Sequence, residues 1–160
     1  MSKTVSVAYG DRWFWAYDVS FRILLLEAVL LAEETPSHER PEGSGKILEG
    51  FRINALVGAD FQFPLDNASW DDRQQQYAHT LIAEAGRRLR SRERITVAEV
   101  AQRYVVGGQP VFLRGVDHVD GPVIADLADA MAALILDELP PVPPPALSWF
   151  YGTPDGIRTL

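Results

Sequence analysis

The sequence contains no cysteine. This absence excludes a disulfide framework, a thiolate metal site and a cysteine nucleophile together. A chain of 160 residues is long enough to bury a stable core without such cross-links. A protein without thiols fits a reducing environment, so we expect a cytoplasmic location. The N-terminal segment also lacks an apolar run followed by a cleavage site, so no secretory signal is predicted.

The chain is poor in lysine and in positive charge. Two Lys stand beside 13 Arg, and 22 acidic side chains outweigh the 15 basic ones, which leaves a net charge of −7. Nucleic-acid binding depends on cationic side chains that neutralise phosphates, so we expect no nucleic-acid partner. The preference for Arg, together with abundant Ala, indicates a GC-rich coding sequence and therefore a bacterial source.

The sequence also lacks an apolar run free of charges that could cross a membrane. The most apolar stretch, residues 13–34, contains Asp18, Arg22 and Glu27. Each charge near the bilayer centre would cost about 2.5–3.5 kcal/mol, which outweighs the gain from a few leucines. We therefore predict no membrane span. Two apolar flanks between thin polar seams are typical of a helix packed on several sides, in which Asp18 and Arg22 are spaced to pair.

The remaining patterns predict an α+β single domain, mostly helical, around a central hydrophobic helix at residues 13–34. Alternation predicts strands at 4–9, 51–57 and 111–116, which would form a small sheet or ribbon. Amphipathic spacing and capping residues predict further helices that begin near residues 67–69, at Thr96 and at Asp120. We assign residues 1–139 to the globular domain and 140–160 to a proline-rich strap and aromatic tail that docks on it.

The most polar short motif, DHVDG, contains Asp117, His118 and Asp120. These groups could act as acid and base or bind a cation, although the ligand pattern of a calcium loop is absent. The alternative is a turn in which Asp120 caps the next helix. His38 and His79 have no ligand spacing with His118, so neither a metal site nor a cofactor is predicted.

Two further clusters each allow two interpretations. The basic stretch at residues 87–94 offers an anion site at Arg87, Arg88 and Arg90, or it is the solvated last turn of a helix. The aromatic triplets at 13–15 and 149–151 either pack together or leave the second triplet exposed as an anchor for a partner.

Three functions remain open at this point. The first is a non-enzymatic, acidic protein-binding module, such as a bacterial immunity protein, inhibitor or chaperone that masks another protein, for example a basic toxin or effector. The second is a small-ligand binder or enzyme that uses the DHVDG motif, and the third is a structural subunit that self-associates through its aromatic tail. The candidate partner-binding residues are Asp117, His118, Asp120, Asp126, Asp129, Trp149, Phe150 and Tyr151.

Overall fold

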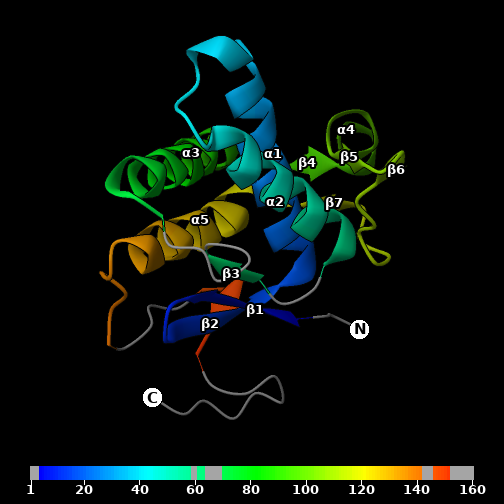
Figure 1. Ribbon diagram of the computed structural model, residues 1–160. Coiled ribbons are helices and arrows are strands. Elements are labelled where there is room, and N and C mark those ends of the chain that lie inside the picture. Colours follow the sequence, from blue (N-terminus) through cyan, green and yellow to red (C-terminus); the bar gives the residue numbers. More distant parts are fainter. Residues whose placement is uncertain (1–3, 59–60, 64–69, 142–145, 152–160) are drawn as a thin grey trace.

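The computed structural model describes residues 4–58, 61–63, 70–141 and 146–151. The helices are α1 (Asp18–Glu33), the 3-10 helix η1 (Ser37–Glu39), α2 (Ser44–Val57), α3 (Asp72–Arg90), α4 (Val97–Arg103) and α5 (Gly121–Ile135). The strands are β1 (Thr4–Tyr9), β2 (Arg12–Tyr17), β3 (Phe61–Phe63), β4 (Ile95–Thr96), β5 (Val105–Val106), β6 (Gln109–Pro110), β7 (His118–Val119) and β8 (Trp149–Phe150). This mostly helical α+β arrangement confirms the predicted fold class (Figure 1). Most of the proline run and the chain after Tyr151 lie outside the described residues.

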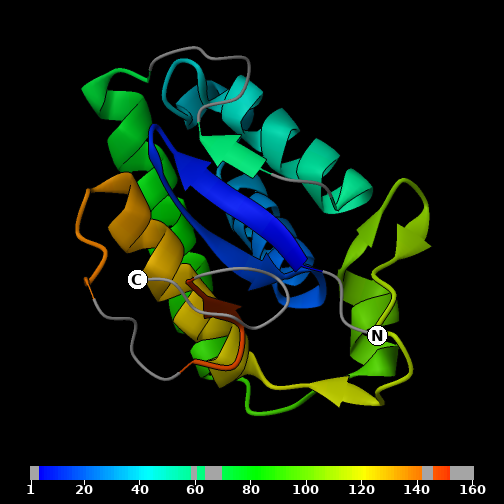
Figure 2. The same ribbon diagram turned by 90° about the horizontal axis from the view of Figure 1, so that it is seen from below.

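A four-stranded sheet in the order β3-β1-β2-β8 lies across one end of the helices (Figures 1 and 2). β1 and β2 form an antiparallel hairpin whose two-residue loop contains Gly10 at a φ of +64°, a conformation that favours glycine. β3 runs parallel to β1, and β8 runs antiparallel to β2. The inner face of the hairpin is fully buried and consists of Val5, Val7, Phe14 and Ala16.

The predicted central helix is present, but its first five residues are a strand. Residues 13–17 belong to β2, and α1 starts at Asp18. Side chains in β2 alternate between the buried face and the outer face, as Phe14 and Trp13 do, and aromatic residues favour this pleated environment. From Asp18 onward α1 is central as predicted, because it contacts α2, α3 and α5.

The predicted strand at residues 51–57 is wrong, because these residues form the second half of α2. The helix begins after Gly43 and ends at Gly58, both of which have positive φ. Its buried apolar residues Ile47, Leu48 and Phe51 follow helical spacing, which outweighs the alternation seen in the sequence. The alternating residues Ile53 and Val57 point to solvent instead.

The other helices match their predicted signals more closely. α3 starts at Asp72, three to five residues later than expected, and Asp71 and Gln74 form its capping box. Thr96 and Glu99 form the predicted capping box of α4. Asp120 occupies the N-cap position of α5, although its side chain makes no capping hydrogen bond. Residues 111–116 are not a strand; the piece that pairs with β5 is Gln109–Pro110.

Helices α3 and α5 pack side by side, and their connected ends meet at Gly121 (Figure 2). The Gly121 amide donates a hydrogen bond of 3.1 Å to the carbonyl oxygen of Arg92. A Cβ at this position would overlap the carbonyl oxygens of Leu89 and Arg92. The start of α5 can therefore approach the end of α3 this closely only with glycine.

We expect Gly121→Ala to lower the free energy of unfolding by about 3 kcal/mol. Overpacking of a protein core typically costs about 1–3 kcal/mol, and the upper end applies here because the added methyl group would meet rigid backbone. Urea denaturation followed by circular dichroism measures this change. Gly45→Ala is the matched control, because nothing lies near that exposed helical position and alanine should stabilise α2 by roughly 0.5–1 kcal/mol. Equal effects at both sites would contradict the close approach.

Candidate functional site

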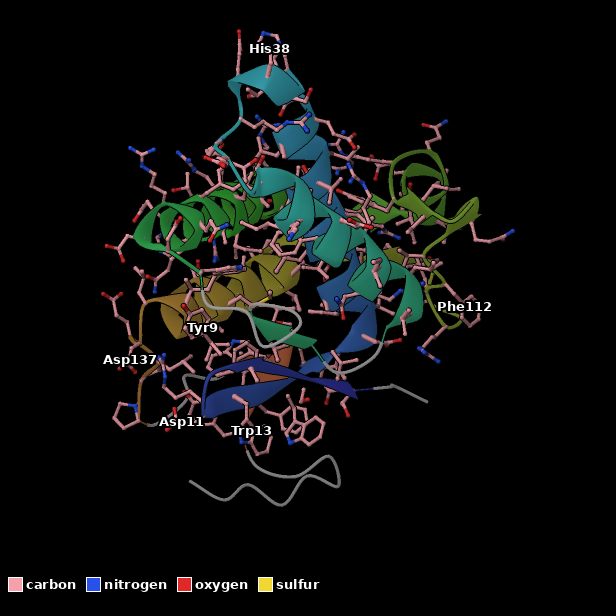
Figure 3. All side chains as sticks on the ribbon, viewed as in Figure 1. Tyr9, Asp11, Trp13, His38, Phe112 and Asp137 are labelled. Atoms are coloured by element: carbon pink, nitrogen blue, oxygen red, sulfur yellow. The ribbon has the colours of Figure 1, made fainter. Side chains whose placement is uncertain are left out.

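Exposed apolar side chains gather where the end of α2 meets the β5–β6 hairpin and the loop that follows it. Nine large apolar side chains are exposed in the described residues, and six of them belong to this group. The most exposed of the six, Phe112, has 67% of its surface open to solvent and points away from the domain in Figure 3. The six residues form the apolar face: Ile53, Leu56, Val57, Val105, Phe112 and Val116.

Three contacts hold the parts of the apolar face side by side. Leu56 packs against Gly107, where a Cβ would approach the Leu56 Cδ1 to 2.9 Å. Arg22 of α1 donates through Nε to a carbonyl oxygen in the last turn of α2 at 2.5 Å. One turn earlier on the same side of α1, Asp18 binds Arg114 of the loop. The end of α2 and the loop are thus fastened to neighbouring turns of one helix.

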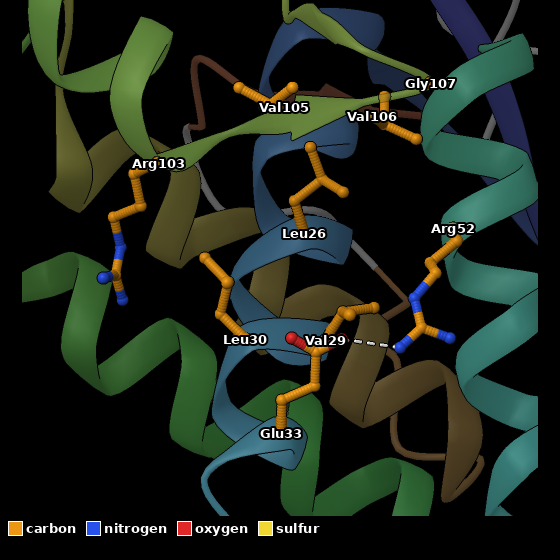
Figure 4. Close-up of a pocket in the computed structure, with 9 residues that line it drawn as sticks. All are labelled: Leu26, Val29, Leu30, Glu33, Arg52, Arg103, Val105, Val106 and Gly107. Carbon is orange, nitrogen blue, oxygen red and sulfur yellow. Dashed lines mark hydrogen bonds and ion pairs between the residues drawn. The ribbon is translucent and has the colours of Figure 1, made fainter.

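Two adjoining hollows lie beside the apolar face. The first has a volume of about 210 Å³, with Leu26, Val29 and Leu30 of α1 lining it between α2 and β5 (Figure 4). The second, of about 360 Å³, is more open and extends along α4 past Glu99. Both are lined by Leu30 and Arg103, so together they form one trough.

A buried carboxylate, Glu27, fixes the wall of the trough. Only 1% of its side chain is exposed, and it accepts hydrogen bonds from Arg103 Nε (3.1 Å), Arg103 Nη2 (2.9 Å) and the Tyr104 hydroxyl (2.8 Å). Arg92 donates to the same Tyr104 hydroxyl at 2.7 Å. The hydrogen bond to Glu27 raises the pKa of the Arg103 guanidinium, so this arginine stays charged. Burial, and then Glu27, raises the pKa of Tyr104 to about 12.

A second buried carboxylate, Asp18, fixes the loop that carries Phe112 and Val116. Its two oxygens accept hydrogen bonds from Arg114 Nη2 at 2.7 Å and from Arg114 Nε at 3.3 Å. Arg114 has a φ of +56°, which is unusual for a residue with a side chain and is held here by this bidentate pair. The predicted ion pair between Asp18 and Arg22 is wrong, because Arg114 takes Asp18 and Arg22 binds α2.

The structure brings Asp117, His118 and Asp120 together at the surface. His118 Nδ1 lies 2.6 Å from Asp117 and its Nε2 lies 3.7 Å from Asp120. The hydrogen bond with His118 lowers the pKa of the Asp117 carboxyl, and Arg94 lies 3.6 Å away. The three side chains line neither of the two hollows, and 80% of Asp117 is exposed. Within the described ranges, no group of three or more His, Asp or Glu side chains could hold a metal ion.

The basic stretch forms ion pairs within the protein. Arg90 binds both Asp126 (3.3 Å) and Asp129 (2.7 Å), so two of the predicted acidic contacts are partly neutralised. Arg87 pairs with Glu84 on α3, and Arg88 pairs with Glu34 and Glu84. The three arginines predicted to hold an anion therefore each have a carboxylate neighbour. This arrangement favours the interpretation as a solvated helix end.

The aromatic triplets meet in the sheet. Phe14 and Trp149 have ring centroids 5.2 Å apart, and Tyr17 and Phe150 are 5.7 Å apart. Trp149 and Phe150 are buried, whereas Tyr151 is partly exposed and donates to the carbonyl oxygen of Pro140 at 2.7 Å. The predicted packing of the triplets on each other is therefore confirmed, and Trp149 and Phe150 are covered by their own chain.

Sequence patterns missed the apolar face. Ile53, Leu56 and Val57 were assigned to a half-buried strand, and Val116 to another, so their exposure could not be seen. The only available signal was the surplus of large apolar residues on the outer side of a helical projection of α2. The placement of Val105 and Phe112 relative to α2 depends on the tertiary fold.

We expect Arg103→Ala to lower the free energy of unfolding by about 3 kcal/mol, because Glu27 would lose its charged partner inside the protein. The value lies at the lower end of the range for broken buried pairs, since Tyr104 would still donate to Glu27. Thermal or urea denaturation tests this. Arg87→Ala is the control: Arg87 is largely exposed, and its loss should change stability by less than about 0.5 kcal/mol. Similar losses would contradict the role of Glu27.

The raised pKa of Tyr104 predicts a late step in a spectrophotometric titration of tyrosine. A group whose pKa is higher in the folded state stabilises the fold below its unfolded pKa, and this contribution disappears as the pH rises through the folded pKa. Stability should therefore fall between pH 10 and about pH 12. Tyr104→Phe should remove the late step seen near 295 nm. A titration curve that is unchanged in this variant would contradict the assignment.

Comparison with known proteins adds no relative from which a function could be transferred. No family model, curated protein or solved structure matches the chain. In the described residues, no helix is both long and apolar enough to cross a membrane. The site with the most distinctive geometry is the apolar face with its adjoining trough.

Proposed function

We propose that this chain is a non-enzymatic protein-binding module and that the apolar face and the trough contact its partner. The observation that carries the proposal is the gathering of six exposed apolar side chains on neighbouring elements beside a hollow. Single exposed apolar residues are normal on protein surfaces, but contiguous patches mark sites of interaction. Aromatic and aliphatic anchors beside such hollows dominate the binding energy of many interfaces.

Within this class, we propose an inhibitor, an immunity protein or a chaperone that masks its partner. A small acidic domain with a rigid core suits this task, since binding then requires little ordering. The net charge of −7 attracts a basic toxin or effector over long distances. The lack of cysteine fits action in the cytoplasm.

The geometry gives less support to the other two functions. Catalysis by Asp117, His118 and Asp120 would need a sheltered space for substrate, whereas Asp117 is largely exposed and neither hollow includes the three side chains. Self-association through the aromatic tail would need Trp149 and Phe150 at the surface, whereas both are buried. The apolar face itself is available to another protein.

We expect Leu56→Asp to abolish capture of a stoichiometric partner from a lysate of the source cell. A carboxylate at the centre of an apolar contact would be desolvated without a partner, which should weaken binding by about 100-fold or more. Leu56 is half exposed and its inner part contacts Gly107, so we expect the variant to keep its fold with a modest loss of stability. Circular dichroism and thermal denaturation check this. Affinity capture with mass spectrometry and light scattering measures binding and stoichiometry.

Leu147→Asp is the matched control. Leu147 is exposed and lies two residues before β8, at the edge of the sheet opposite β3, so the change should leave capture intact. A partner lost equally in both variants would contradict docking at the apolar face. A second copy of this chain as the captured species would replace the proposed masking of another protein with self-association.

A further inference from the structure

The outer face of the sheet, which faces away from the helices, carries a group of aromatic side chains. Along β2 the inner residues Phe14 and Ala16 are fully buried, so the residues that alternate with them face outward. Phe150 of β8 pairs with Trp15 and therefore lies on the same outer side. The four side chains form the outer aromatic face: Trp13, Trp15, Tyr17 and Phe150.

The rings of the outer aromatic face contact each other in pairs. The ring centroids of Trp13 and Trp15 are 5.4 Å apart, and those of Tyr17 and Phe150 are 5.7 Å apart. Small residues occupy the positions opposite β2 on the neighbouring strand β1: Thr4, Ser6 and Ala8. Large rings beside small side chains form a shallow apolar shelf on which another segment of chain can lie.

The two ends of the outer aromatic face differ in exposure. Trp13, beside the β1–β2 turn, has 49% of its surface open to solvent and points away from the helices in Figure 3. At the other end, Phe150 is 7% exposed and Ser148, two residues earlier and on the same side, is 1% exposed. The outer face of a sheet that packs on helices is ordinarily open to water. The burial of Phe150 and Ser148 therefore indicates a cover at the β8 end.

The C-terminal segment starts at this covered end. The last described residue, Tyr151, directly follows β8. Residues 152–160 come next, and nine extended residues span at most about 30 Å. Neighbouring strands lie only about 5 Å apart, so the segment is long enough to cross from β8 over β2 to β1. It also contains two large apolar residues, Ile157 and Leu160, that suit contact with aromatic rings.

We propose that residues 152–160 return across the sheet and shield the outer aromatic face, with Ile157 and Leu160 packed on its rings. This inference does not depend on the proposed docking function. A short tethered segment has an effective concentration on the order of millimolar, so even a weak contact is occupied. The contact also removes the exposed part of Trp13 from water. The C-terminal segment thereby prevents a second apolar surface from competing with the apolar face for partners.

Other occupants fit the outer aromatic face less well. A second copy would bring together two chains that each have a net charge of −7, and this repulsion opposes self-association. A separate protein would find Phe150 and Ser148 already buried within the single chain. The C-terminal segment requires no second molecule and is attached at the edge where the burial is greatest.

A spin label on the C-terminal segment tests the inference. The chain has no cysteine, so Thr159→Cys provides a single attachment site for a nitroxide. The label weakens the NMR signals of nearby hydrogen atoms. We expect the indole N–H signals of Trp13 and Trp15 to lose most of their intensity, whereas the amide signals of α4, which lies away from the sheet in Figure 1, should stay unchanged. Chemical reduction of the nitroxide should restore the lost signals.

Two variants test whether the apolar residues of the segment make the contact. The double substitution Ile157→Ser and Leu160→Ser should reduce the effect of the spin label on Trp13 and increase the quenching of tryptophan fluorescence by acrylamide. Arg158→Lys is the matched control, because it changes the same segment and keeps both apolar residues. An equal response to the two variants would contradict the proposed packing.

A mixture of spin-labelled chain and isotope-labelled chain without nitroxide separates contacts within one chain from contacts between chains. Loss of the Trp13 and Trp15 signals in this mixture would assign the segment to a second copy and overturn the inference. In the singly labelled chain, signal loss at Leu56 and Phe112 in place of the two tryptophans would place the segment on the apolar face, which also overturns it. If no signal changed, the outer aromatic face would have a different cover and the inference would be wrong.

Discussion

Two carboxylates buried on α1 determine how the outer part of the molecule is arranged. Glu27 and Asp18 need charged partners inside the protein, because an unpaired buried charge is far more costly than an exposed one. Arg103 and Arg114 provide these partners from the segment that carries α4 and the β5–β6 hairpin. The requirement to neutralise α1 thus positions both the wall of the trough and the loop bearing Phe112.

The same requirement explains why arginine is used at these positions. A side-on bidentate bond satisfies the buried carboxylate with two N–H groups and leaves the rest of the planar group at the surface. Lysine has a single ammonium group and could not bind the inner carboxylate in this bidentate geometry. One guanidinium group therefore serves both the buried ion pair and the solvent-facing wall of the trough.

Local signals in the sequence predicted much of the fold. The capping boxes of α3 and α4 depend on residues three apart, so both could be detected in the sequence, although the α3 pair was not singled out. The central position of α1 followed from its two apolar flanks. The secondary structure was predicted wrongly where a local pattern is compatible with two structures. Residues 13–17 suit a helix or a strand, and pairing with β1 makes them a strand. The apolar face joins α2 to residues more than 45 positions later in the chain, so a local pattern could have indicated its α2 part alone. Asp18 likewise could not be paired correctly, because Arg114 lies 96 residues away.

The close approach of α3 and α5 at Gly121 has a consequence for how the molecule could diversify. Everything from β4 to β7 lies between two backbone positions, Arg92 and Gly121, that are joined by a hydrogen bond of 3.1 Å. An insert whose ends already touch can change in length at low entropic cost, because closing a longer loop costs little more than closing a shorter one. The helical hairpin of α3 and α5 would accept different inserts between the same two ends. An exchanged insert would have to keep charged partners for Glu27 and Asp18, which Arg103 and Arg114 supply from this segment.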